Sequence, residues 1–158
     1  MAKLLVDERK LIPAFHLFGR DGMFDSSSYR RKKNLVLFFL TDPDISFLGR
    51  LDEALKGFRQ ENGQAAVIVP LSLSLIEELH KKSRLTFPVL SDENKDVMSL
   101  FLSVSGAERA AALFITDRFG EVFFRSLADC AADLPPLEDI VRSLAFVESQ
   151  RPECGEEI

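Results

Sequence analysis

Few residues in this sequence could do chemistry. The chain has two cysteines, Cys130 and Cys154, and two histidines, His16 and His80. Two scattered histidines are too few for a zinc site, and we expect neither a metal nor a cofactor. No signal-like segment opens the sequence, so the cysteines do not indicate a structural disulfide. The chemistry that remains is that of a free thiol, whose reactive form is the thiolate.

Charge and composition exclude several classes of partner. The 158 residues carry a net charge of −5, which argues against a nucleic-acid surface. No apolar run approaches the length of a membrane span, so we expect a cytoplasmic protein with no membrane and no nucleic-acid partner. One basic cluster precedes an apolar strand, and we interpret it as a solvated turn rather than an anion site. It consists of Arg30, Arg31, Lys32 and Lys33.

Two buried strands and a helix form the centre of the predicted fold. Residues 34–40 read "NLVLFFL", which is typical of a strand buried on both faces, and residues 65–70 read "AAVIVP", a second such strand. Between them, one apolar stripe at helical spacing predicts a helix that ends at Gly63. Its members are Phe47, Leu48, Leu51, Leu55 and Phe58.

Hairpins are predicted on either side of this centre. Residues 14–30 alternate around a Gly-Arg-Asp-Gly turn, with Asp25 or Ser26 as the cap of a short helical turn. Residues 111–125, "AALFITDRFGEVFFR", form the clearest hairpin in the chain. Most of the 14 phenylalanines fall in strand-like runs, which indicates core packing.

Three further helices and a short strand complete the prediction. Ser72 or Ser74 caps a helix that carries Leu75, Ile76, Leu79 and His80. A short strand ends at Ser91, and a helix follows from about Asn94, burying Val97, Met98, Phe101 and Leu102. A final helix presents Leu137, Ile140, Val141, Leu144 and Val147 on one side. Alternating strands and helices predict one α/β domain over residues 1–158, with a mixed central sheet flanked by helices and a loose tail at 151–158.

This order of elements resembles the thioredoxin fold. Three phrases are similar to the peroxiredoxin-like branch, the alkyl hydroperoxide reductase and thiol-specific antioxidant family. They are "LFGRDG...YRRKKNLVLFFL", "FPVLSDEN" and "LFITDRFGEVFFR". The likeness extends from about residue 11 to residue 155, and it implies a homodimer as the first partner to expect.

The resemblance also implies where the active site would lie. Family members place a Thr or Ser three residues before a peroxidatic Cys, in the first turn of a helix whose amides stabilise the thiolate. The matching residues here are Ser46 and Gly49, and glycine cannot form a sulfenic acid. The family's peroxide-binding arginine falls near Ala111, so Arg109 is the nearest candidate. Thioredoxin-like relatives often keep a cis-proline in the same strand, but "AALFITD" has none.

The remaining polar residues near this turn are predicted to be structural. A serine hydroxyl is a poor nucleophile without an adjacent base, so we expect Ser46 to cap the helix, with Thr41 and Asp44 as turn and cap residues. Some relatives end in Cys-Pro-x-Cys-Gly. Here "RPECG" keeps only Cys154, which we expect to be unreactive and exposed. We expect Cys130 to be a small buried apolar residue.

Three functions follow from this pattern. The first is a catalytically degenerate thioredoxin-fold protein that serves as a binding or assembly module through residues 42–50 and the edge of the last hairpin. The second is a thiol-dependent oxidoreductase of the peroxidase type that uses Cys154, with Cys130 or a partner thiol. The third is a small-ligand sensor in the remnant pocket near Thr41, Ser46 and Arg109.

Overall fold

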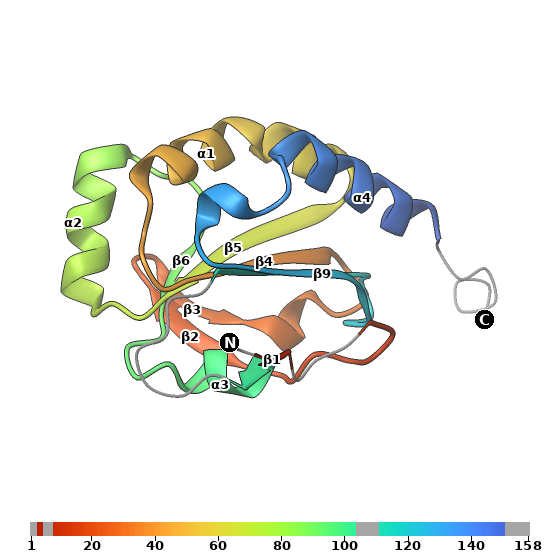
Figure 1. Cartoon of the computed structure of the whole chain (residues 1–158), viewed down its shortest axis with the longest axis horizontal. Helices are drawn as coiled ribbons and strands as arrows, with labels where there is room; N and C mark the ends of the chain where they lie inside the picture. Colours follow the sequence, from red (N-terminus) through yellow and green to blue (C-terminus); the bar gives the residue numbers. More distant parts are fainter. Residues whose placement is uncertain (1–2, 5–7, 104–110, 151–158) are drawn as a thin grey trace.

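A computed structural model describes residues 3–4, 8–103 and 111–150. Its centre is a seven-stranded sheet with the order β3-β2-β6-β5-β4-β8-β9 (Figure 1). β4, β5 and β6 are parallel, whereas β2, β3, β8 and β9 pair antiparallel with their neighbours. The mixed sheet and both hairpins are therefore confirmed. The strands are β2 (His16–Gly19), β3 (Gly22–Asp25), β4 (Asn34–Leu40), β5 (Gly63–Val69), β6 (Val89–Ser91), β8 (Ala111–Thr116) and β9 (Val122–Ala128).

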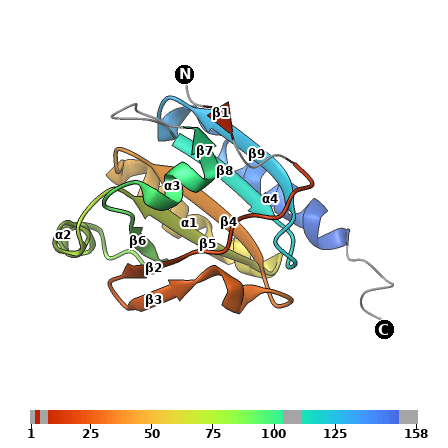
Figure 2. The same ribbon diagram turned by 90° about the horizontal axis from the view of Figure 1, so that it is seen from below.

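Helices cover both faces of this sheet. In Figure 1, α1 and α4 lie above the sheet and α3 lies below it, and Figure 2 shows the molecule from the α3 side. A separate two-stranded pairing joins β1 (Lys3–Leu4) to β7 (Leu102–Ser103). Within the described part of the chain, no helix is both long and apolar enough to cross a membrane. The helices are α1 (Ile45–Gln60), α2 (Leu73–Ser83), α3 (Asp96–Phe101) and α4 (Leu137–Ser149), with 3-10 turns η1 (Ser26–Tyr29) and η2 (Ala131–Asp133).

β4 separates two hydrophobic cores. All seven of its residues are buried, and alternate side chains enter opposite cores because the side chains of a strand alternate between its faces. Val36, Phe38 and Leu40 pack with α1 and α4 in one core. Leu35, Leu37 and Phe39 pack in the other, where aromatic rings from four elements and from the segment before β2 meet. Those rings are Phe15, Phe24, Phe39, Phe101 and Phe114.

Helix boundaries differ from the prediction at two places. α1 ends at Gln60, and Gly63 is already the first residue of β5. The left-handed residue in this turn is Asn62, with φ of 60°. A Cβ at Gly63 would clash with Leu144 of α4, so close helix packing rather than turn geometry explains this glycine. Leu102 is buried as predicted, but it belongs to β7 rather than to α3.

Side chains from outside each helix satisfy the first amides of several helices. Asp25 caps η1 and Ser72 caps α2, as predicted. α3 has no side-chain cap at its own first residue. Instead, the buried carboxylate of Asp92 accepts hydrogen bonds from the backbone N–H groups of Val97, at 3.0 Å, and Met98, at 2.8 Å. The "FPVLSDEN" phrase therefore contains, in Asp92, the residue that fixes the start of α3.

Candidate functional site

A hollow of about 290 Å³ lies where β4 ends and α1 begins. Ala111 of β8 pairs with Leu40 of β4 on one side and with Ala128 of β9 on the other. This register brings the loop after β9 beside the loop after β4. The hollow is lined by Leu40, Thr41, Asp42, Pro43, Asp44, Ala111, Asp129, Cys130 and Ala131.

Asp44, not Ser46, caps the helix at this hollow. The Asp44 carboxylate accepts a hydrogen bond from the Phe47 N–H at 3.2 Å, and the Asp44 carbonyl accepts one from Leu48 N–H at 2.9 Å. The prediction that Ser46 is the cap is wrong, because Ser46 lies one residue inside α1 and is exposed. A carboxylate at a helix N-terminus complements the helix dipole. The tip of α1 therefore carries its own negative charge.

Gly49 lies in α1 one turn beyond this cap, and it does not line the hollow. A Cβ built on Gly49 would meet no atom within 4 Å. The fold therefore has room for a side chain at the position where the resemblance expects a cysteine. The sequence lacks a cysteine at position 49, but packing would not prevent one.

Cys130 is exposed and lines the hollow beside Thr41, so the prediction that it is a buried apolar residue is wrong. It precedes η2, and its thiol donates a hydrogen bond to the Asp133 carboxylate at 3.4 Å. The sequence around it, "SLADCAAD", is rich in alanine and gave no sign of this exposure. The register of the last hairpin was the available signal, because it places the residues after β9 next to Ala111.

Only some of the other predicted site residues line this hollow. Thr41 is half-buried and Ala111 is buried, and both line the hollow. Arg109 and Cys154 lie outside the described residues. None of the described peptide bonds is cis. His16 is exposed on β2 and His80 lies in α2, so neither histidine joins this hollow.

The hollow is acidic. Asp42, Asp44 and Asp129 contribute carboxylates, and the described residues of its lining include no Lys, Arg or His. Cationic neighbours and helix tips activate cysteines, whereas carboxylates oppose a thiolate. Among residues 3–4, 8–103 and 111–150, no three metal-binding side chains are grouped as a metal site. The arrangement is suited to neutral or cationic groups rather than to an anion.

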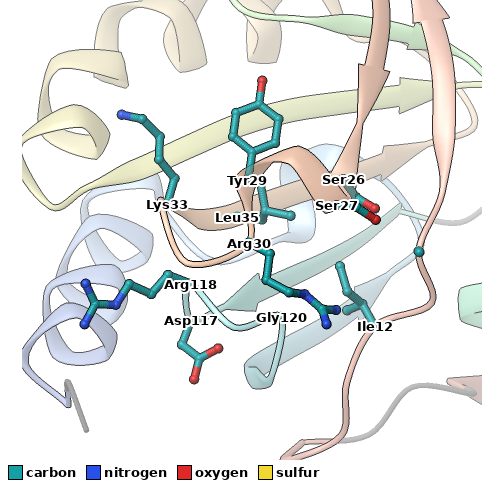
Figure 3. Close-up of a pocket in the computed structure, with 11 residues that line it drawn as sticks. Ile12, Ser26, Ser27, Tyr29, Arg30, Lys33, Leu35, Asp117, Arg118 and Gly120 are labelled. Carbon is teal, nitrogen blue, oxygen red and sulfur yellow. The ribbon is translucent and has the colours of Figure 1, made fainter. Parts of the chain in front are cut away.

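A second, much smaller hollow lies at the basic turn before β4. It measures about 10 Å³, enough for a single water at most. Figure 3 shows that its basic side chains diverge: Lys33 and Arg118 point to one side, and Arg30 points toward Gly120 and Ile12. Because the cations do not converge, they do not form an anion site, and the interpretation as a solvated turn stands.

Tyr29 borders this turn and is the single tyrosine of the chain. Its ring stacks on Phe24, with centroids 5.0 Å apart and planes at 28°. Burial raises the pKa of the Tyr29 phenol above its ordinary value, because the phenolate loses hydration.

Gly49→Ala is expected to stabilise the protein by roughly 0.5–1 kcal/mol, because alanine orders a helix at lower entropic cost and meets no neighbour here. Gly63→Ala is the matched control, and we expect it to destabilise by roughly 1–3 kcal/mol because its Cβ would overlap Leu144. Urea unfolding of both variants measures the difference. A loss of stability in Gly49→Ala would contradict the open space at this position.

Titration of Tyr29 should reveal its burial. The phenolate absorbance of the native protein is expected to rise at higher pH than that of the protein unfolded in guanidinium. Above pH of about 10 the unfolded chain loses this proton first, so the free energy of unfolding should fall as pH rises. Phe24→Leu, which removes the stacked ring, should move the native midpoint toward the unfolded one. Coincident native and unfolded curves would exclude the predicted burial effect.

Comparison with solved structures finds the same architecture in several proteins. Peroxidoxin BcpB from Mycobacterium tuberculosis superposes with a TM-score of 0.78 at 18% identity, over 93% of this chain and 99% of that one. The mitochondrial 2-Cys peroxiredoxin from Plasmodium falciparum gives 0.74 at 18% identity, over 89% and 94%. A protein described as the thiol:disulfide interchange protein DsbE from Chlorobium tepidum gives 0.73 at 18% identity, over 89% and 99%. No protein-family model and no curated protein matches the chain. At these identities the likeness establishes the fold: the chain has the thioredoxin-like α/β fold that peroxiredoxins share.

Proposed function

We propose that this protein is a catalytically degenerate, peroxiredoxin-like thioredoxin-fold protein that acts as a binding or assembly module. The observation that carries the proposal is Gly49, which occupies the position where the resemblance expects the peroxidatic cysteine. Reduction of a peroxide in that family begins with attack by a thiolate, and glycine offers no atom for this step.

The surroundings of Gly49 support the same proposal. The Asp44 carboxylate accepts the hydrogen bond of the Phe47 N–H at the helix tip. In an active member of the family, such helix-tip amides would stabilise a thiolate. The family's peroxide-binding arginine is expected near Ala111, and its nearest candidate, Arg109, lies outside the described residues. Two features of the family's site thus differ together: the nucleophile and the charge at the helix tip.

We propose a homodimer as the first assembly, formed through the edge of the last hairpin. β9 is the outer strand of the sheet, and outer strands present unpaired backbone groups to partners. Among the described residues, Arg9 and Lys10 pair with its start through hydrogen bonds with Val122, and the Glu8 carboxylate lies 3.8 Å from the Arg125 guanidinium. Beside this edge, Phe146 of α4 is 49% exposed and contacts the ring of Phe124. We further propose that the protein acts in the cytoplasm, where an exposed Cys130 would stay reduced.

A thiol-dependent oxidoreductase of the peroxidase type is the second candidate. It is favoured by the exposed Cys130 beside Thr41 in the acidic hollow. In this reading Cys130 and Cys154, or one of them with a partner thiol, would exchange between thiol and disulfide. The carboxylates that line the hollow weigh against it, because they oppose formation of the thiolate.

Small-ligand binding at the remnant site is the third candidate. The hollow at Thr41 has the volume for a small molecule, although Ser46 does not line it and Arg109 lies outside the described residues. A neutral or cationic ligand would match the three carboxylates there. Like the first candidate, this one involves no redox chemistry.

A peroxidase assay separates the first proposal from the second. We expect hydrogen peroxide consumption with dithiothreitol to be the same for the wild type, Cys130→Ser, Cys154→Ser and the double variant, at the background rate of a free thiol. Gly49→Cys is the control that places a thiol at the position where the resemblance expects one, because the fold has room for that side chain. A rate that falls at least about tenfold in either single Cys→Ser variant, about 1.4 kcal/mol of transition-state free energy, would establish a thiol enzyme instead.

Light scattering coupled to size-exclusion chromatography tests the assembly. We expect a dimer for the wild type and a shift to monomer in Phe146→Lys, which places a charge at the proposed interface. Leu100→Lys is the matched control, because Leu100 is 50% exposed on α3, on the other face of the sheet. A wild type that stays monomeric over a hundredfold range of concentration would refute the proposed homodimer.

A further inference from the structure

Residues 8–12, which we call the strap, run along the outer side of β9. The Arg9 N–H donates to the Val122 carbonyl at 2.7 Å, and the Val122 N–H donates to the Lys10 carbonyl at 2.9 Å. Because β9 is the outer strand of the sheet, Val122 would otherwise offer both of these backbone groups to another chain. The strap therefore takes the first pairing position on this edge.

The two ends of the strap are held differently. Ile12 is 7% exposed and packs in the core that contains Phe39, and its N–H donates to the Gly120 carbonyl at 3.0 Å. At the other end, the Glu8 carboxylate lies 3.8 Å from the Arg125 guanidinium, and the Glu8 side chain is 53% exposed. Ion pairs at the surface contribute little to stability. The strap is therefore anchored firmly at Ile12 and only weakly at Glu8.

Arg9 holds the middle of the strap at a conformational cost. Its φ is 70°, in the left-handed region that disfavours residues with a side chain. Its guanidinium lies 4.2 Å from the centre of the Phe123 ring and 3.9 Å from the Glu121 carboxylate, and the Arg9 side chain is 65% exposed. Backbone strain of this kind persists only where surrounding contacts enforce it. Residues 8–11 can therefore leave β9 at low cost while Ile12 stays in place.

Release of the strap changes what β9 offers to a partner. With the strap in place, a second strand can pair with residues 123–128 of β9, and without it the edge begins at Val122. A backbone group that is left unpaired in an interface costs binding free energy. The strap and a partner strand therefore compete for the same N–H and carbonyl groups.

We propose that the strap regulates the homodimer: residues 8–11 compete with the β9 strand of a second copy for the edge at Val122, and their release strengthens the dimer. This proposal rests on the homodimer proposed above. It adds that a segment near the N-terminus sets how much of the edge a second copy can use.

Two substitutions of Arg9 separate the backbone of the strap from its side chain. Both remove the guanidinium. Arg9→Gly keeps the N–H and adopts a φ of 70° without strain, whereas Arg9→Pro has no N–H and cannot adopt this φ. In hydrogen–deuterium exchange followed by NMR, we expect the Val122 amide to exchange at least about tenfold faster in Arg9→Pro than in Arg9→Gly, because only proline releases the strap.

Sedimentation equilibrium of the same variants measures the effect on assembly. The dissociation constant of the dimer is expected to be at least about tenfold lower for Arg9→Pro than for Arg9→Gly, because two more backbone groups become available to the partner. The wild type should resemble Arg9→Gly, since both keep the strap on β9.

A measurement on the wild type alone covers the case in which a variant fails to fold. If the strap opens locally, low urea concentrations should leave the exchange rate of the Val122 amide unchanged. The Leu37 amide in the central strand β4 should exchange faster with added urea, because its exchange requires global unfolding.

Each of three results would overturn the proposal. The first is a wild-type Val122 amide whose exchange rises with urea as that of Leu37 does. The second is equal exchange of the Val122 amide in the two variants. The third is dimers of equal affinity in both variants, which would exclude the competition and leave the homodimer intact. If every variant is monomeric at all concentrations, the homodimer is refuted, and its regulation by the strap with it.

Discussion

The double burial of β4 is the constraint on which the rest of this structure depends. Each face of the strand contributes to a different hydrophobic core, and six register pairs with β5 and five with β8 fix its position. A shift by one residue would exchange Phe38 and Phe39 between the two cores. Because the strand cannot slide, its last residue is fixed, and with it the start of α1 and the acidic hollow between them.

Patterns along the chain predicted most of this architecture. Continuous apolar runs marked β4 and β5, and the Gly-Arg-Asp-Gly and Asp-Arg-Phe-Gly turns marked the two hairpins, because these signals are local. The cap of α1 was harder to assign, since Asp44 and Ser46 both suit a helix start. Only backbone geometry decides which side chain can reach the Phe47 amide.

Features that depend on residues far apart in sequence could not be read in this way. Cys130 resembles a core residue in its alanine-rich context, yet the β8–β9 register places it at the surface beside Thr41. Gly63 appeared to be a helix terminator, whereas contact with Leu144 explains it. The imidazole of His80, which has no hydrogen-bond partner among the described residues, has no local signature, because the helical pattern predicts only its burial.

If the site is degenerate, as we propose, a thioredoxin-like fold persists here without the redox chemistry of its structural neighbours. The fold supplies a helix tip at the end of a buried strand, and the chemistry depends on the few side chains placed there. In this chain those places hold a carboxylate, a glycine and an alanine, from Asp44, Gly49 and Ala111. Stability and chemistry are separable, since none of the three residues contributes a large side chain to either core.

The single register position that joins β2 to β6 has a mechanical consequence. The long ladders on both sides of β4 resist displacement as units, but the N-terminal hairpin is attached to its neighbour at Gly19 alone. Backbone pairing therefore holds this hairpin less firmly than it holds β5 or β8, and the hairpin depends on the packing of Phe24 in the core that contains Phe39 to stay in place.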